Sequence, residues 1–242
     1  MNGLESLADK VKTTIRKAKF KRHSPWMTKF MIDGKFYGGW WDAMKDERIV
    51  TQFRRAFPDA RKVLELGSFE GGHTFALAKQ PGILHVMGLE GRAANLKRAE
   101  FAKQMMGIRN VQFVRVNFEE PGVLEKFHGF DAVCCSGVLY HLPRPWELLK
   151  QLEKISSRLF LCTHYCTADN ATVEQGSYKG VWYEEGGLTD PLSGLSRKSF
   201  WPTLASLSAM LEDAGFADIE IIKADETVQY GPRVQLVAKK RV

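Results

Sequence analysis

The 242-residue sequence lacks any apolar run long enough to cross a bilayer, and its first residues, MNGLESLADKVK, contain no apolar signal core. These absences argue against a membrane-spanning protein and predict a cytoplasmic location. Cysteine is also scarce, at four residues, which fits a compartment where thiols stay reduced. The spacing of Cys162, His164 and Cys166 matches no zinc signature, so we expect no metal site.

The body of the chain has little net charge. The formal net charge is +7, and residues 1–35 supply +6 of it, whereas the other 207 residues hold 26 Lys/Arg and 25 Asp/Glu. Within this basic leader, apolar residues recur at helical spacing and predict one stripe of a helix: Leu4, Leu7, Val11, Ile15 and Ala18. We favour a helix packed on the domain. The alternatives are contact with an anionic membrane surface or with a nucleic-acid backbone.

Beyond the leader, strand and helix patterns alternate. Strands are expected at 62–66, 83–89, 111–116, 131–135, 158–163, 218–223 and 233–238. Helices are expected at 72–80, 92–106, 121–128, 145–156 and 202–214, the last supported by Pro202 near its start and Gly215 past its end. This alternation predicts an α/β fold, a Rossmann-like, mainly parallel sheet of seven strands covered by helices on both faces.

Three further features concern the organisation of this fold. We divide the chain into residues 1–45, a basic helix with an aromatic segment, and a domain at 46–242. Residues 164–200 have no clear period and are expected to form a long binding loop or lid. Cys134 and Cys135 should pack on opposite faces of one strand, because successive side chains alternate.

The stretch KVLELGSFEGGHT, at 62–74, has the strand, glycine turn and helix that open a nucleotide site. A dinucleotide fingerprint begun at Gly67 would need glycine at position 69, where this chain has Phe69. Nicotinamide oxidoreduction is therefore disfavoured. Glu65, just before the turn, suits a ligand whose amino group needs a counter-charge rather than a pyrophosphate. The glycines could alternatively do no more than end the strand and begin the helix.

Polar residues also follow the next strands, at the sheet edge where ligands bind in this architecture. Glu90 ends the second strand, where an acid can accept hydrogen bonds from both ribose hydroxyls. Asn117 could address an adenine edge or serve only as a turn residue. Together these features describe S-adenosylmethionine. The residues expected to bind it are Glu65, Gly67, Ser68, Gly71, Gly72, Glu90, Asn117, Phe118, Ser136 and Gly137.

Candidate catalytic residues are Tyr140, His141 and His164, which follow the fourth and fifth strands. An imidazole titrates near neutrality and can take a hydroxyl proton during methyl transfer, although a loop histidine can equally be only a hydrogen-bonding residue. Tyr37, Trp40 and Trp41 are candidate substrate contacts, since aromatic walls bind sugars, nucleobases and sulfonium groups; the tryptophans could instead be core residues.

Two motifs carry a family resemblance. The turn ELGSFEG resembles the first motif of the class I methyltransferases, E/D-x-G-x-x-x-G, which implies S-adenosylmethionine as cofactor. The segments CSGVLYHLPRPWELLKQL (135–152) and FWPTLASLSAMLEDAGFADIEI (200–221) resemble one branch, the tRNA wobble-uridine carboxymethyltransferases. That branch grips a carboxylated cofactor, and the resemblance implies Lys29, Tyr140 and Arg197 for this task.

We therefore predict an S-adenosylmethionine-dependent methyltransferase. The first choice of acceptor is a hydroxyl on a small molecule or glycan, because the body is nearly neutral and residues 30–41 and 164–200 could close over such a substrate. The first alternative is modification of the tRNA wobble uridine, with tRNA as partner. The second is a non-catalytic binding module that keeps the fold. Peripheral contact with an anionic membrane stays open for the leader, and the oligomeric state is not predicted.

Overall fold

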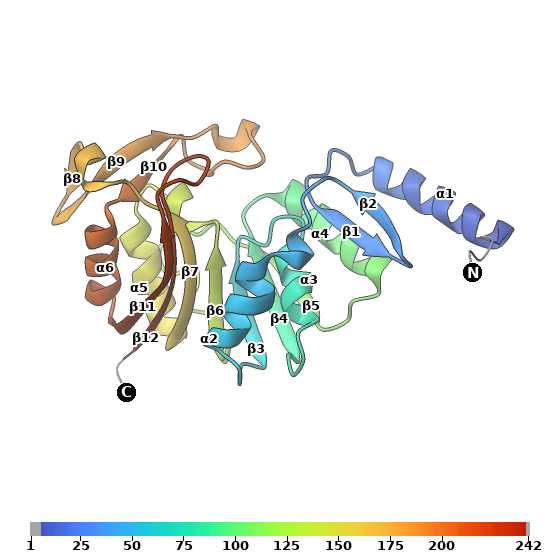
Figure 1. Ribbon diagram of the computed structural model, residues 1–242, viewed down its shortest axis with the longest axis horizontal. Helices are drawn as coiled ribbons and strands as arrows, with labels where there is room; N and C mark the ends of the chain where they lie inside the picture. The colour runs from blue at the N-terminus through green and yellow to red at the C-terminus, as the bar shows by residue number, and fades with distance from the viewer. Residues whose placement is uncertain (1–5, 241–242) are drawn as a thin grey trace.

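The structure, a computed structural model, describes residues 6–240. Its centre is a seven-stranded sheet in the order β11-β12-β7-β6-β3-β4-β5, in which β12 runs antiparallel to both of its neighbours (Figure 1). The strands are β3 (Lys62–Leu66), β4 (His85–Glu90), β5 (Val111–Arg115), β6 (Ala132–Ser136), β7 (Arg158–His164), β11 (Phe216–Asp225) and β12 (Arg233–Lys240). All seven strands expected from the sequence are confirmed, as is the Rossmann-like arrangement.

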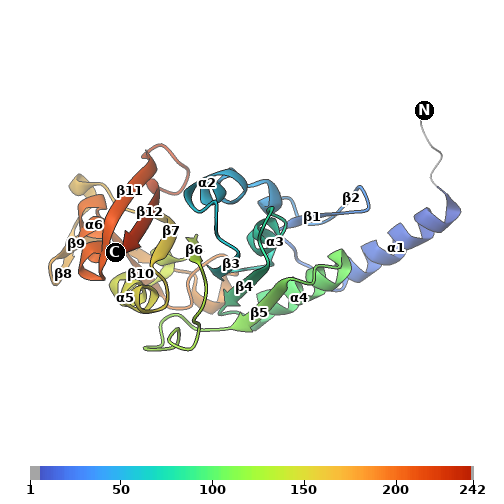
Figure 2. The same ribbon diagram turned by 90° about the horizontal axis from the view of Figure 1, so that it is seen from below.

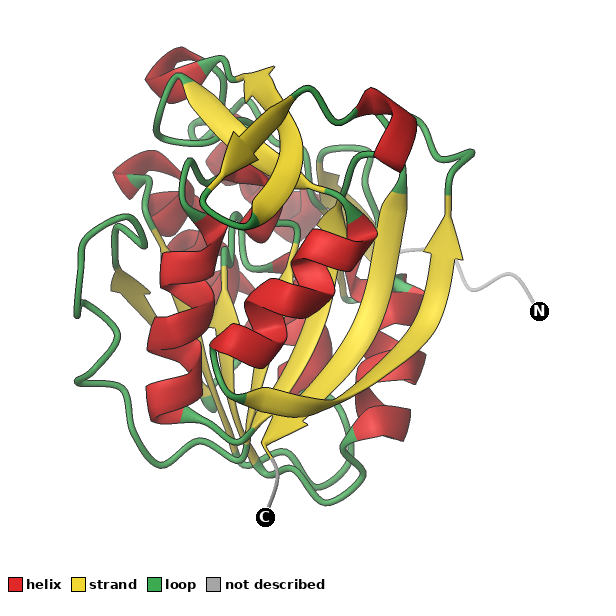
Figure 3. Cartoon of the chain, turned by 90° about the vertical axis from the view of Figure 1, so that its left-hand side faces the viewer, coloured by secondary structure: helices red, strands yellow, loops and turns green. Residues whose placement is uncertain are grey.

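Helices cover both faces of this sheet (Figure 3). One face packs against α3 (Gly72–Ala78) and α4 (Ala93–Met106), and the other against α5 (Pro145–Ile155) and α6 (Leu204–Asp213). Cys134 belongs to the apolar cluster of the first face and Cys135 to that of the second, which confirms their predicted alternation. The two hydrophobic clusters hold the sheet rigid, so the loops at its carboxyl edge have a fixed base.

Two predictions about regular structure were wrong. Residues 121–128 form no helix: residues 121–126 are turns, and Gly122 adopts a left-handed φ of +71°, which ends any helical run there. Residues 164–200 are not one long loop, because they contain an antiparallel sheet of β8 (Val173–Gln175), β9 (Tyr178–Glu184) and β10 (Lys198–Pro202). Pro202 accordingly ends a strand, and the Thr203 hydroxyl caps α6 by accepting from the Ser206 N–H at 3.1 Å.

The N-terminal part forms a separate layer beside α3 and α4. It comprises α1 (Leu7–Lys21) and the hairpin β1 (Lys29–Ile32) and β2 (Lys35–Gly38). Figure 2 shows α1 extending away from the body. Its side chains Leu7, Val11 and Ile15 are 78%, 50% and 50% exposed, so the expected packing of this stripe on the domain was wrong. Leu4 lies outside the described residues. Only Phe20, in the last turn, is buried, against Trp26 and Phe101.

Short helical turns complete the chain. They are η1 (Ala43–Lys45), η2 (Arg48–Phe53), α2 (Arg54–Ala56), η3 (Leu139–His141), η4 (Ala168–Asn170) and η5 (Gly187–Thr189). Within residues 6–240, no helix combines the length and the apolar character that crossing a membrane requires.

Candidate active site

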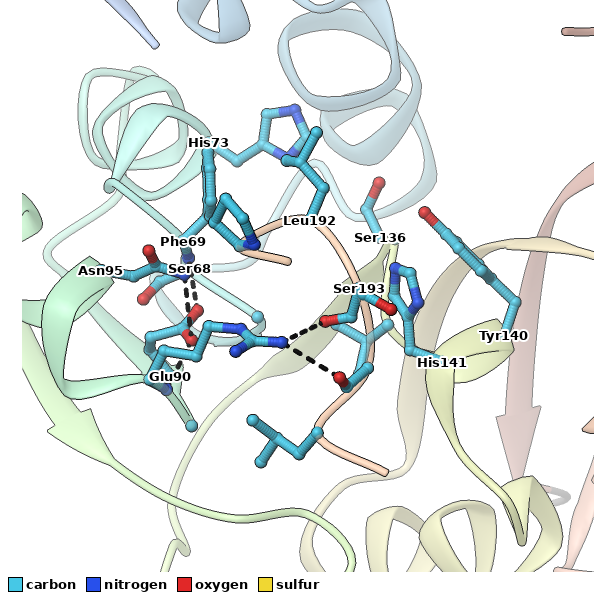
Figure 4. Close-up of a pocket in the computed structure, with 18 of the residues that line it drawn as sticks. Ser68, Phe69, His73, Glu90, Asn95, Ser136, Tyr140, His141, Leu192 and Ser193 are labelled. Carbon is cyan, nitrogen blue, oxygen red and sulfur yellow. Dashed lines mark hydrogen bonds between the residues drawn. The ribbon is translucent and has the colours of Figure 1, made fainter. Parts of the chain in front are cut away.

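A cavity of about 430 Å³ opens at the carboxyl ends of β3, β4, β5 and β6. This is the edge at which open α/β sheets bind ligands. The turns after the strands form one wall, the N-terminal layer contributes Trp40 and Trp41, and residues 191–195 form part of another wall. Figure 4 shows side chains from these segments converging on the cavity.

Most of the predicted site residues line this cavity. They are Trp40, Trp41, Gly67, Ser68, Gly72, Glu90, Asn117, Phe118, Ser136, Gly137, Tyr140 and His141. Six others do not line it: Lys29, Tyr37, Glu65, Gly71, His164 and Arg197. Sequence reasoning also missed Met27, Arg48, His73 and Arg92, which the fold brings to the same cavity from other segments.

The turn after β3 explains why Phe69 replaces a glycine. Gly67 has a φ of +73°, and a Cβ there would meet Val138 Cγ2 at 2.3 Å, so this position requires glycine. Phe69 also has a positive φ, +50°, but it lines the cavity with its side chain. Its N–H donates to Glu90 Oε2 at 2.9 Å. The turn therefore presents its amide to a carboxylate of the protein rather than to a pyrophosphate.

Glu90 is fixed by backbone donors. Besides the Phe69 N–H, the Arg92 N–H donates to Oε1 at 2.8 Å. Burial raises the pKa of Glu90, and these two hydrogen bonds act in the opposite direction. Because the two amides hold the carboxylate at the cavity wall, its remaining lone pairs can accept from hydroxyls of a ligand.

Several buried oxygen atoms in the cavity have no hydrogen-bond partner among the described residues. They are Ser68 Oγ, Ser136 Oγ and Glu119 Oε1. Buried polar atoms are normally paired, so an unpaired set in one cavity indicates that a polar ligand supplies the partners. The ribose hydroxyls and the amino and carboxyl groups of S-adenosylmethionine offer such partners. The cavity therefore fits the cofactor that the sequence implies.

Glu65 lies below the turn rather than at the cavity surface. It is 1% exposed and accepts a hydrogen bond from the Thr74 hydroxyl. Burial raises the pKa of Glu65 to about 8, so its carboxyl is protonated at neutral pH. Because Glu65 does not line the cavity, its role as the counter-charge for a ligand amino group stays a prediction. In this geometry, Glu65 braces α3 against β3.

This buried carboxyl should make the stability of the protein depend on pH. Its pKa is raised in the folded state to about 8 and lies near 4.3 when unfolded, so the folded state binds the extra proton between these values. Folding free energy should therefore weaken by up to about 1.4 kcal/mol per pH unit as the pH rises through this window. Glu65→Gln should reduce the fall in melting temperature between pH 5 and pH 8. The exposed Glu120→Gln control should keep the wild-type fall, and equal slopes in all three proteins would contradict the prediction.

His141 pairs with a carboxylate that the sequence reasoning did not find. Its Nδ1 lies 3.0 Å from Glu185 Oε1 and 3.1 Å from Oε2. The Glu185 side chain is only 2% exposed. Although burial alone would raise the pKa of Glu185, hydrogen bonds from His141, Ser193 and the Gly194 N–H lower it to about 2. An ionised Glu185 makes Nδ1 the donor, which leaves Nε2 of His141 without its proton in the neutral ring.

Tyr140 and His164 lie next to this pair. The Tyr140 ring centre is 4.1 Å from that of His141 and 4.7 Å from that of His164. Burial raises the pKa of Tyr140 to about 12, so its hydroxyl keeps its proton at neutral pH. His164 Nδ1 donates to the carbonyl oxygens of Gly231 and Pro232 at 3.0 and 3.1 Å. His164 is thus hydrogen-bonded to the backbone, with its ring next to that of Tyr140.

The remaining predicted contacts lie elsewhere. Tyr37 is buried in the N-terminal layer and stacks on Phe20. Arg197 is exposed. Lys29 pairs with Asp42 at 3.4 Å and, like Arg197, does not line the cavity. Neither cation implied for a carboxylated cofactor therefore faces the site.

Glu70 explains how the N-terminal layer reaches the cavity. Its buried carboxylate accepts from the backbone N–H groups of Met27 and Thr28, at 3.0 and 2.7 Å to Oε2. Gly72 permits the same approach, since a Cβ there would meet Ala43 Cβ at 2.5 Å. These contacts bring Trp40 and Trp41 to the cavity. The signal in the sequence was Glu70 itself, a carboxylate placed between Phe69 and Gly71 in the glycine turn.

Comparison with known proteins agrees with this geometry. A family model described as "Methyltransferase domain" matches residues 58–188. The crystal structure of the N-terminal domain of EvdMO1, in the presence of SAH and D-fucose, is 34% identical with a TM-score of 0.84. This match covers 95% of the present chain and 97% of that domain.

Two curated relatives are the tRNA U34 carboxymethyltransferases of Desulforapulum autotrophicum and Shewanella sediminis. Each is 28% identical, over 67% and 81% of this chain respectively. The chain spans about half the length of these relatives, 46% and 54%. The family model, the SAH-bound structural neighbour and the turn at Gly67 all agree. The chain belongs to the class I methyltransferases and is an enzyme that uses S-adenosylmethionine.

Proposed function

We propose that this enzyme methylates a hydroxyl group on a sugar-like small molecule or glycan. The observation that carries the proposal is an aromatic rim on the same cavity as His141, whose Nε2 can accept a proton. Trp40 and Tyr230 both line the cavity while remaining 72% and 75% exposed, and Trp41 also lines it. Aromatic faces left open at a cavity mouth suit the apolar faces of sugar rings. The domain of EvdMO1 with D-fucose present supports the same acceptor class.

Different residues of the cavity would bind the cofactor and take the proton of the acceptor. Glu90 would hold the ribose hydroxyls, and the Gly67–Ser68 turn with Ser136 would hold the methionine end. Bound S-adenosylmethionine supplies a methyl group on a sulfonium, whose carbon–sulfur bond breaks as the bond to the acceptor oxygen forms. His141 takes the hydroxyl proton on Nε2. Alignment of the two reactants, which can contribute about 7–11 kcal/mol, is the main task of the other residues.

The direct test supplies wild-type enzyme with S-adenosylmethionine and a panel of deoxy sugars, methyl glycosides and tRNA. SAH release and product mass then report which acceptor is methylated. We expect transfer to a sugar hydroxyl and none to tRNA. Transfer only to a nitrogen, a carboxylate or a nucleic acid would overturn the proposal.

Removing one rim residue should weaken acceptor binding. Trp40→Ala should raise the KM of the sugar acceptor about fivefold, or about 1 kcal/mol, because the ring loses its stacking face. The affinity for SAH, measured by calorimetry, should stay within twofold. Phe36→Ala is the matched control, since Phe36 is also an exposed aromatic of the N-terminal layer but does not line the cavity. An unchanged KM in Trp40→Ala would contradict the role of the rim.

A second candidate is carboxymethylation of a tRNA wobble uridine. The projecting basic helix α1 favours it, because the exposed side chains of Lys10, Lys12, Lys17 and Lys19 could contact a phosphate backbone. Arg16 is instead paired with Asp33 at 2.6 Å. The similarity to the carboxymethyltransferases supports the same idea. The positions of Lys29 and Arg197 speak against it. Retention of tRNA at low salt is compared between the full chain and a chain lacking residues 1–22. The same two proteins are tested with anionic vesicles, which shows whether α1 binds nucleic acid or a membrane surface.

A further inference from the structure

We propose that Glu185 is a positioning residue for His141, and that it acts from a segment that must cover the cavity for the base to be assembled. This segment, residues 185–195, is called the cover segment. The inference rests on the proposed function, because a base is needed only if the acceptor is a hydroxyl. Glu185 touches neither cofactor nor acceptor in this scheme and acts through the histidine.

The Glu185 carboxylate is held on all sides by donors. Oε2 accepts from the Gly194 N–H at 2.8 Å and from the Ser193 hydroxyl, and Oε1 accepts from the Ser199 hydroxyl at 2.7 Å. These donors leave His141 Nδ1–H as its remaining partner. A carboxylate fixed in this way fixes the ring of the histidine and its tautomer, so that Nε2 is the basic nitrogen.

The cover segment is also tied to the cofactor side of the cavity. The Arg92 guanidinium donates to the carbonyl oxygens of Gly187, Ser193 and Gly194 at 2.9, 2.8 and 3.0 Å. The backbone N–H of Arg92 holds Glu90. One segment is therefore clamped between the carboxylate that would hold the ribose and the histidine that would take the proton.

Close backbone packing reinforces the clamp. Gly194 lies against His141, and a Cβ there would meet the carbonyl oxygen of His141 at 2.4 Å. Pro191, Leu192 and Leu195 line the cavity from the same segment. The cover segment that lines the cavity is thus also the segment that orients His141. The hydroxyl proton passes to Nε2 of His141, and the negatively charged Glu185 carboxylate stabilises the imidazolium that forms without taking its proton.

The test compares Glu185→Gln with Glu184→Gln, a neighbouring carboxylate that is exposed. Glutamine has nearly the same shape, but its amide has one acceptor oxygen for four donors and adds N–H groups. The kcat for the sugar acceptor should fall about tenfold in Glu185→Gln, with the KM and the SAH affinity within twofold. Glu185→Asp, which keeps the charge, should recover part of the loss. Glu184→Gln should behave as wild type.

The tautomer of His141 can also be observed by spectroscopy, without any measurement of activity. In protein labelled with nitrogen-15 histidine, neutral His141 of the wild type should carry its proton on Nδ1, and Glu185→Gln should shift it toward Nε2. If wild type methylates sugars and Glu185→Gln matches it in both kcat and tautomer, the positioning role fails and the proposed function stands. If the tautomer shifts but wild type transfers no methyl group to any hydroxyl, the proposed function fails while the positioning of His141 by Glu185 holds.

Discussion

His141→Asn is expected to lower kcat for a hydroxyl acceptor by about 10²-fold to 10⁴-fold, the range that a lost general base costs. The asparagine amide can still donate to Glu185 from a position close to that of Nδ1, so the cover segment keeps its contact. No basic nitrogen remains to take the acceptor proton. Steady-state kinetics with saturating S-adenosylmethionine measure the loss, and SAH affinity should change by less than threefold.

Two further histidine variants show whether the loss of kcat is specific to His141. His128→Asn is the control, because His128 is exposed and lies outside the cavity. His164→Asn tests the other candidate base, whose Nδ1 is committed to the carbonyl oxygens of Gly231 and Pro232. If His164→Asn abolished transfer while His141→Asn retained it, the base would have to be His164. Full activity in both variants would show that the acceptor needs no base, as for a nitrogen or carboxylate.

The strands and the cofactor turn were predictable because their signals are local. A strand has a short apolar run, and the turn at Gly67 has glycines at fixed positions. Glu90 was found by the same logic, since a strand end has a known place in this architecture. The structure confirms the sheet and places these residues at one cavity, while their contacts with the cofactor stay predictions.

The partners of these residues were not predictable in the same way. Glu185 and His141 are 44 positions apart, and Arg92 is 95 positions from Gly187, whose carbonyl it binds. No local pattern links such pairs. The antiparallel sheet at residues 173–202 was missed because Gly180 and the short strands break the alternation that marks a longer strand. The apolar stripe of α1 followed helical spacing, but spacing cannot say whether another surface covers it.

Glu90→Ala is expected to weaken SAH binding by about a hundredfold, or about 2.7 kcal/mol. The carboxylate would accept from two ribose hydroxyls, and hydrogen bonds to a charged group contribute about 1.5–3 kcal/mol each in measured series. Calorimetry with SAH measures the change without any acceptor. Glu90→Gln keeps one acceptor oxygen and should show an intermediate loss, because the Phe69 and Arg92 N–H groups compete with the ribose for it.

The outcome also depends on how the turn responds. Alanine leaves the N–H groups of Phe69 and Arg92 without their acceptor, and the Arg92 guanidinium also holds the cover segment through the Ser193 carbonyl. The thermal unfolding of each variant must therefore be measured together with the calorimetry. Glu120→Ala is the control, an exposed carboxylate on the next loop that does not line the cavity. A folded Glu90→Ala protein that bound SAH as tightly as wild type would remove Glu90 from the cofactor site. The ribose would then have to be held by Glu119 or by the hydroxyls of Ser68 and Ser136, whose oxygen atoms are the ones in the cavity that lack partners among the described residues.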